Sequence, residues 1–183
     1  MEIGLATVSE AEALTDMWVD LASEQIRYGS RVLPEANRGV IRDELTRHAV
    51  TDRLAVARDE STAAREDGIV GFVMFTVDRG SYEMGVTQGI VENLYVRPDR
   101  RDEGIGSELL RTAERRLETL GAETVVLEAM ADNEPARRFY RRHGYGSYRV
   151  QLEKPLDDDP GGHSGENDGQ ARRRNDNHTK EGE

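Results

Sequence analysis

A short stretch rich in glycine and arginine is the part of the sequence best suited to bind a phosphate group. The stretch is Arg101-Asp102-Glu103-Gly104-Ile105-Gly106-Ser107. Glycine has no Cβ atom, so the first backbone N–H groups of a helix that starts here can approach a ligand closely. Those N–H groups and the positive end of the helix dipole favour a bound anion. The stretch therefore predicts a phosphate site, and Arg100 and Arg101 add positive charge beside it.

Two common nucleotide-binding signatures rely on the same physics but are absent from this stretch. The dinucleotide fingerprint Gly-x-Gly-x-x-Gly would need a third glycine where Leu109 stands. The phosphate-loop signature Gly-x-x-x-x-Gly-Lys-Ser/Thr does not occur here either. An oxidoreductase with a nicotinamide cofactor is therefore a weaker interpretation. It would be supported if the protein bound a nicotinamide cofactor more tightly than coenzyme A.

A strand before the glycines and a helix after them would position this phosphate site. Residues 87–96 predict the strand, and apolar residues at helical spacing predict the helix, which ends at Gly121. A buried strand is predicted next, over 123–130, and strand–helix–strand order implies that these two strands pair in parallel. The apolar residues of the helix are Ile105, Leu109, Ala113, Leu117 and Leu120.

A second segment with a characteristic spacing follows the buried strand. It reads Asn133-x-x-Ala136-x-x-Phe139-Tyr140-x-x-x-Gly144-Tyr145. Pro135 suits the first turn of a helix, and Gly144 suits the residue after its end. The segment therefore predicts a short helix with Phe139 and Tyr140 on one face.

The Arg-x-x-Gly-x-Gly string and this later segment, in this order, resemble the two coenzyme A-binding segments of the GNAT (Gcn5-related N-acetyltransferase) superfamily. The resemblance covers most of residues 1–154, strongly over 89–145 and only by architecture before that. It implies an α/β (α+β) fold. Its mixed, mainly antiparallel sheet would have about six to seven strands, flanked by helices and splayed between the fourth and fifth strands.

The resemblance also implies an activity, in which an acetyl group moves from acetyl-CoA, the co-substrate, to a primary amine by direct attack. No covalent enzyme intermediate is needed, which agrees with a chain that has no cysteine. The acceptor is expected to be a small-molecule amine or a protein amine. A non-catalytic acyl-CoA-binding or interaction module on the same fold is the alternative.

Cofactor contacts follow from the resemblance residue by residue. The backbone of Leu94, Tyr95 and Val96 is expected to pair with the pantetheine arm and to orient the thioester carbonyl. Asn133 is expected to hydrogen-bond either the pantetheine or the start of its own helix. The pyrophosphate would lie on the backbone of Arg101, Asp102, Glu103, Gly104, Ile105, Gly106 and Ser107.

Tyr140 and Glu92 are the two candidates for proton transfer. In the resembled superfamily a tyrosine in the position of Tyr140 often protonates the departing thiolate, although this ring could instead only pack. Some members use a glutamate on the cofactor strand as a base, and a carboxylate beside an apolar wall has the raised pKa that suits this task. Period-two alternation places Glu92 on the face opposite Asn93 and Tyr95. The competing interpretation is a polar residue without a proton role.

The segment before the sheet's centre is expected to be helical. Ser9 and Glu12 predict a capping box at the start of a helix that runs to about Arg27, and a second helix follows around Leu45. In the resembled superfamily this region shapes the acceptor site. The chain's histidines lack metal-ligand spacing, so no metal is predicted and none of them is given a role. They are His48, His143, His163 and His178.

Other elements complete the prediction. Strands are expected at 1–8, 53–58, 68–78 and 145–153, with a hairpin loop over 59–67 and a turn over 79–85. Residues 155–183 are almost devoid of aliphatic side chains and are expected to form a disordered polar tail after a 1–154 acetyltransferase domain. Basic residues of the last helix could neutralise coenzyme A phosphates, but at least two should pair with surface acids. They are Arg137, Arg138, Arg141 and Arg142.

The charge balance limits the range of partners. The chain of 183 residues has 36 acidic against 25 basic side chains, a net charge of -11. Sequence-independent binding to nucleic acid is therefore not expected. No apolar run approaches the roughly 20 residues of a membrane span, so we expect a cytoplasmic protein, with a homodimer left open. Lys154 and Lys180 are the only lysines; this and the acidic surplus suggest a halophilic origin, although an arginine-biased genome would look similar.

Overall fold

A computed structural model describes residues 1–59, 68–78 and 85–156 of the chain. The chain divides into two compact units, Met1–Gly146 and Ser147–Glu183. The helices and strands described below all belong to the first unit. The predicted hairpin loop, the predicted turn and the predicted tail lie largely outside the described residues, and the domain division at residue 154 stays a prediction.

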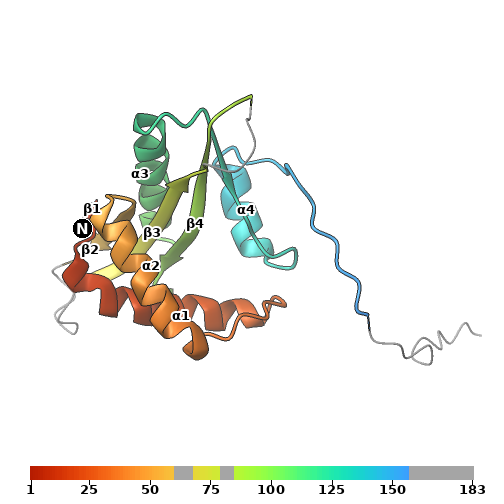
Figure 1. Ribbon diagram of the computed structural model, residues 1–183, viewed down its shortest axis with the longest axis horizontal. Helices are drawn as coiled ribbons and strands as arrows, with labels where there is room; N and C mark the ends of the chain where they lie inside the picture. Colours follow the sequence, from red (N-terminus) through yellow and green to blue (C-terminus); the bar gives the residue numbers. More distant parts are fainter. Residues whose placement is uncertain (60–67, 79–84, 157–183) are drawn as a thin grey trace, which may run out of the picture. The chain divides into compact units, whose positions relative to one another are not determined.

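A single sheet forms the centre of the first unit (Figure 1). Its strands follow the chain in the order β1-β2-β3-β4-β5, and neighbouring strands are antiparallel except for the parallel pair β4–β5. The predicted mixed, mainly antiparallel sheet and its parallel pair are thus confirmed. The strands are β1 (Glu2–Leu5), β2 (Leu54–Arg58), β3 (Ile69–Val77), β4 (Gln88–Val96) and β5 (Thr124–Leu127).

Helices cover both faces of this sheet and bury two hydrophobic clusters. The first cluster joins α1 and α2 to one face through residues such as Leu14 and Leu45. The second joins α3 to the opposite face through Leu109, and side chains of α4 pack against it. The helices are α1 (Ala11–Ile26), α2 (Arg38–Val50), α3 (Ile105–Thr119) and α4 (Glu134–Arg142).

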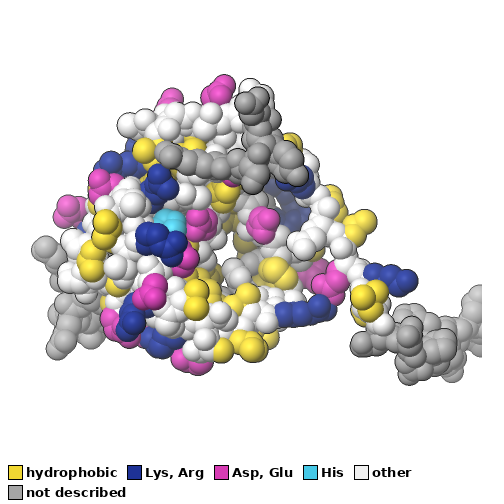
Figure 2. Space-filling model, in the orientation of Figure 1, with side chains coloured by type: hydrophobic (Ala, Val, Ile, Leu, Met, Phe, Trp, Pro, Cys, Tyr) yellow, Lys and Arg dark blue, Asp and Glu magenta, His cyan; other side chains and the backbone are white. Residues whose placement is uncertain are grey.

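Charged side chains of both signs are interspersed over α1 and α2 (Figure 2). Arg38 at the start of α2, for example, pairs with Asp16 of α1 at 2.6 Å and with Glu12 at 3.4 Å. Exposed ion pairs of this kind contribute little stability one by one. They nevertheless show that some acidic side chains on this surface are paired with arginine.

The predicted capping box at Ser9 and Glu12 is wrong, because the chain turns two residues earlier. The Thr7 N–H donates to Glu10 Oε2 at 2.7 Å, and the Thr7 hydroxyl donates to the same carboxylate. A short 3₁₀ turn, Val8–Glu10, precedes α1. The Ser9/Glu12 pair has the same type and spacing, so sequence spacing alone could not choose between them.

A β-bulge interrupts β4 in the middle of the sheet. Met74 of β3 lies opposite Asn93, but the next residue, Phe75, lies opposite Val91. Glu92 is therefore an extra residue without a partner in the antiparallel ladder. Such a bulge reverses the side-chain alternation along a strand and bends it locally.

Two consequences of the bulge concern Glu92 itself. The parallel ladder with β5 ends at the Val91–Leu127 pair, so from Glu92 onwards no described strand pairs with β4 on that side. Glu92 also lies on the same face as Tyr95, because Glu92 reaches His48 of α2 and Tyr95 packs in the cluster below α1 and α2. The expectation that they occupy opposite faces is wrong, since the alternation does not continue through the bulge.

The predicted count of six to seven strands is also wrong, because the described residues form five. The strand expected at 145–153 has no strand hydrogen bonds. Its alternating apolar side chains are exposed, with Tyr148 at 64%, Val150 at 79% and Leu152 at 89%. Alternation shows which side chains a strand could bury, but a strand also needs a hydrogen-bonded neighbour.

Close backbone packing between β3 and β4 predicts a stability effect at Gly71. A Cβ atom there would lie 2.8 Å from the Tyr95 carbonyl oxygen and 3.1 Å from Leu109. Gly71→Ala should therefore lower the free energy of unfolding by about 1–3 kcal/mol, the usual effect of overpacking. Gly39→Ala in α2 is the control, because nothing lies within 4 Å of its Cβ position. Urea unfolding should show a loss for Gly71→Ala alone; equal stability of both variants would contradict the close approach.

Candidate active site

The open part of β4 presents backbone groups that no strand among the described residues covers on the β5 side. β5 pairs only with Gln88–Val91, and Leu94 and Val96 lie beyond the end of that ladder. Their side chains pack in the cluster under α3, together with Phe139 and Tyr140 of α4. The described pairing of β4 and β5 therefore ends within β4, where the sequence predicts the splay, and side chains of α4 pack against the same cluster as Leu94 and Val96.

The loop before α3 contains a row of backbone N–H groups that make no hydrogen bond to the described residues. Asp102 and Gly104 both have left-handed backbone conformations, with φ of 65° and 83°, and Gly104 is the N-cap of α3. Within the described residues, the backbone N–H groups from Asp102 to Gly106 have no hydrogen-bond acceptor. Such a turn directly before a helix is suited to bind an anion. The negative charge of the anion is stabilised by the positive end of the helix dipole.

The two arginines beside this loop are already engaged by carboxylates. Arg100 bonds Glu103 and Asp59, and its hydrogen bond to Glu103 lowers the pKa of that carboxyl. Arg101 bonds Glu24 of α1 at 2.8 Å and the Val96 carbonyl at 3.0 Å. The loop's attraction for an anion therefore comes mainly from its backbone rather than from unpaired guanidinium charge.

Ser107 at the start of α3 is tied to the end of α4. Its hydroxyl lies 2.9 Å from His143 Nε2, and His143 Nδ1 lies 2.8 Å from the Phe139 carbonyl. A carbonyl only accepts, so Nδ1 carries a hydrogen, and in neutral His143 the Ser107 hydroxyl donates to Nε2. His143 was given no role from sequence, because a contact between two helices leaves no local spacing signal.

Tyr140 lies in α4 among other aromatic rings. Its ring contacts Phe139 and Tyr145, with centroids 5.2 and 5.8 Å apart. Burial raises the pKa of Tyr140 to about 12, so its hydroxyl keeps its proton at neutral pH. No group among the described residues hydrogen-bonds this hydroxyl, whereas the Tyr145 hydroxyl donates to Glu114 at 2.8 Å.

Asn133 caps α4, and the basic residues of that helix pair with an acid. The Asn133 side-chain oxygen accepts the Ala136 N–H at 3.1 Å, which is the helix-start role that the sequence left open. The expectation that at least two of the four arginines pair with acids is confirmed, because three of them lie within 4.0 Å of Glu134. The three are Arg137, Arg138 and Arg141.

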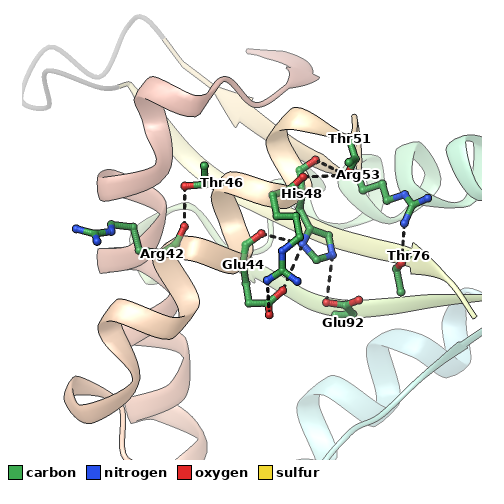
Figure 3. A network of polar contacts seen from close by, with 9 residues as sticks. Arg42, Glu44, Thr46, His48, Thr51, Arg53, Thr76 and Glu92 are labelled. Atoms are coloured by element: carbon green, nitrogen blue, oxygen red, sulfur yellow. Dashed lines mark hydrogen bonds and ion pairs between the residues drawn. The ribbon is translucent and has the colours of Figure 1, made fainter.

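Glu92 belongs to a polar network between α2 and β4 (Figure 3). Its Oε2 atom lies 3.4 Å from His48 Nε2, and the side chain is 29% exposed. His48 Nδ1 lies 2.9 Å from the carbonyl of Glu44, one turn earlier in α2. His48 was also missed from sequence, although its spacing from the buried Ile41 and Leu45 places it on the inner face of α2.

Tyr95 shares the α1–α2 face with Glu92 and lies near carboxylates of α1. Burial and, to a smaller extent, the charges of Asp20 and Glu24 together raise the pKa of Tyr95 to about 12. The guanidinium of Arg101 lies 5.7 Å from the centre of its ring. The open part of β4 thus faces a partly acidic environment on this side.

The comparison with known protein families agrees with this architecture. A profile of the acetyltransferase (GNAT) family matches residues 17–145. This match covers more than half of the chain, which therefore belongs to the acetyltransferase (GNAT) family.

Two curated relatives match parts of the chain. A mycothiol acetyltransferase of Clavibacter sepedonicus is 32% identical over 149 residues, which are 77% of this chain and 45% of that protein. An aminoalkylphosphonate N-acetyltransferase of Salmonella typhimurium is 37% identical over 68 residues, which are 37% of this chain and 44% of that protein. The chain thus spans less than half the length of either relative.

Solved structures share the fold. A GCN5-related N-acetyltransferase from Ralstonia eutropha matches with a TM-score of 0.63 and 23% identity, over 85% of this chain and 97% of that one. A putative acetyl transferase from Pyrococcus furiosus matches with a TM-score of 0.56 and 26% identity, over 85% and 100%. Among the described residues, no helix is both long and apolar enough to span a membrane.

Proposed function

We propose that this chain transfers the acetyl group of acetyl-CoA to a primary amine by direct attack. The observation that carries the proposal is the row of N–H groups from Asp102 to Gly106, for which the described residues provide no acceptor and which follows the open part of β4 after the short 3₁₀ helix Pro98–Arg100. A phosphate-binding turn and an uncovered strand backbone, joined end to end, suit a ligand with a pyrophosphate and an extended amide-containing arm.

In this proposal the loop holds the pyrophosphate, and the β4 backbone from Leu94 to Val96 hydrogen-bonds the pantetheine amides. A β4 N–H then polarises the thioester carbonyl and stabilises the oxyanion that develops on it. Asn133 retains its side-chain NH₂ group for the pantetheine, because only its oxygen is used in capping α4.

The proton transfers are assigned to two side chains. Glu92 accepts a proton from the acceptor amine, directly or through one water molecule, so that the neutral nitrogen can attack the carbonyl carbon. The C–N bond forms, the C–S bond breaks, and Tyr140 gives its proton to the departing sulfur. The raised pKa of Tyr140 keeps it protonated for this role, and its hydroxyl is not engaged by a described residue.

We further propose a small-molecule amine as the acceptor rather than a protein amine. Two features support this: the carboxylates of Asp20 and Glu24 lie near Tyr95, and the Salmonella relative is by name an acetyltransferase of aminoalkylphosphonates. An ammonium group would be attracted to the acidic side of the opening before Glu92 removes its proton.

A panel of amines with detection of released thiol tests the proposal. The panel should contain small aliphatic amines, aminoalkylphosphonates, and peptides with a free N-terminus or lysine. We expect thiol release that depends on both the protein and a small amine, with the N-acetylated product identified by mass. Faster transfer to peptides would contradict the acceptor class. Tight acetyl-CoA binding without turnover of any amine would instead favour a non-catalytic acyl-CoA-binding module.

A further inference from the structure

His48 is one of two buried polar residues in the part of the chain that the structure describes. Among the described residues only Thr15 and His48 are polar and buried, with exposures of 0% and 8%. The Thr15 hydroxyl is satisfied within its own helix, where it donates to the Ala11 carbonyl. His48 instead points from α2 toward the bulge of β4, and its outer ring nitrogen faces Glu92 (Figure 3).

The hydrogen bond of His48 to its own helix determines which nitrogen can change its protonation state. The Glu44 carbonyl can only accept, so Nδ1–H donates to it at 2.9 Å. Nε2 is left facing Glu92 Oε2 at 3.4 Å. When both groups lack a proton, two lone pairs face each other in a half-buried site, so the pair takes up one proton more readily than either group would alone.

The acidic groups around the His48 ring also favour its protonated form. Burial alone would lower the pKa of His48, but the hydrogen bond and charge of Glu92, together with Glu44, outweigh it and raise that pKa above its usual 6.5. The Glu44 carboxylate lies 4.0 Å from Nδ1 and is itself paired with Arg47. Arg53, on the far side, directs its guanidinium to Thr76 instead of the ring.

We propose that His48 and Glu92 act as one proton-accepting unit, in which His48 stores the proton that Glu92 takes from the amine. This inference rests on the proposed function. The proton passes from the amine to Glu92 and on to His48 Nε2, and the unit changes from a net charge of minus one to zero. After product release, the partly exposed Glu92 returns the proton to solvent.

The unit has a defined pH dependence. Below the pKa of His48 the ring is already protonated and the unit holds its proton, so it cannot accept another. Above that pKa the unit is empty and active, and the rate should rise with pH through a value above 6.5. A lone glutamate would titrate near the ordinary carboxylate value of about 4.3, which would move this acid limb to lower pH.

An NMR titration of the His48 ring tests the shared proton without any acceptor. Its signal is identified by its loss in His48→Gln. We expect a His48 pKa above 6.5 in the parent and a fall by about one unit or more in Glu92→Gln. Burial lowers this pKa, and the variant lacks the Glu92 charge that opposes the effect of burial. Glu44→Gln keeps the backbone carbonyl and is the matched control, with a smaller expected shift. An unchanged His48 titration in Glu92→Gln would overturn the shared proton.

A double-mutant cycle tests the role of the pair in acetyl transfer, using the best amine of the panel. His48→Gln should lower kcat at neutral pH by about tenfold or more, shift the acid limb downward and leave the KM for acetyl-CoA unchanged. Combining it with Glu92→Gln should add little further loss, because the residues act as a unit. Additive losses with an unmoved acid limb would show a merely structural His48 and overturn the inference.

The two experiments also separate this inference from the proposed function. If the parent acetylates no amine, the proposed function fails and the catalytic role of the pair fails with it. The NMR titration would still decide whether His48 and Glu92 share a proton. Acetyl transfer in the parent together with an unshifted His48 would instead refute the pair and leave the proposed function standing.

Discussion

The Tyr140→Phe variant is expected to bind acetyl-CoA as the parent does but to turn over about a hundredfold more slowly. The substitution keeps the ring and its contacts with Phe139 and Tyr145 and deletes only the hydroxyl. General acid assistance is typically worth 10²–10⁴-fold, or roughly 3–5 kcal/mol of barrier, and no described residue depends on this hydroxyl for a hydrogen bond. Steady-state kinetics and a binding isotherm for acetyl-CoA measure both quantities.

Tyr145→Phe is the matched control for this prediction. The Tyr145 hydroxyl is bonded to Glu114, so its loss should lower stability by about 1 kcal/mol and leave kcat nearly unchanged. A fall in acetyl-CoA affinity with unchanged kcat in Tyr140→Phe would make the Tyr140 hydroxyl a binding contact instead of an acid. Because burial raises the pKa of Tyr140 to about 12, we expect no basic limb of the rate from this hydroxyl near neutral pH.

The paired change Gly104→Asp and Gly106→Asp is expected to abolish the thermal protection that acetyl-CoA provides. Both carboxylates would lie beside the N–H groups assigned to the pyrophosphate. Unit charges of the same sign about 4 Å apart near a protein surface repel by about 4 kcal/mol, which corresponds to more than a hundredfold in affinity. Differential scanning fluorimetry with and without acetyl-CoA measures this loss directly.

The unliganded double variant should remain folded, which makes the result interpretable. Aspartate is a favourable N-cap and tolerates the left-handed conformation of Gly104, as Asp102 already does in this loop. A Cβ atom at Gly106 would lie 3.5 Å from the Phe139 ring, an ordinary contact. Changing both glycines to asparagine gives the same shape without charge and should retain more protection. Full protection in the aspartate variant would rule out the loop as the pyrophosphate site.

Local patterns allowed the central half of the fold to be predicted from sequence. The buried residues Ile105, Leu109, Ala113 and Leu117 define α3 by their spacing, and the helix ends before Gly121, as predicted; the structure adds that Gly121 has a left-handed conformation. The parallel pairing of β4 and β5 followed from the order strand, helix, strand. These features depend on residues close in sequence, where periodicity and glycine conformation are informative.

Features that depend on tertiary contacts were missed or misplaced. The bulge at Glu92 has no recognisable signal in the sequence, since it arises from how β3 pairs with β4. The predicted face of Glu92 is wrong because simple alternation does not include the bulge. His48 lies 44 positions from Glu92 in sequence but 3.4 Å away in space. The expected strand at 145–153 has the right alternation but no partner among the described residues.

A crystal structure with bound coenzyme A tests the central claim most directly, because the claim concerns where the cofactor lies. We expect the pyrophosphate on the N–H groups of Asp102 to Gly106, the pantetheine beside Leu94 to Val96, and the sulfur within hydrogen-bond distance of the Tyr140 hydroxyl. Coenzyme A bound elsewhere on the chain, or a sulfur atom out of reach of Tyr140 and of the open part of β4, would contradict the account.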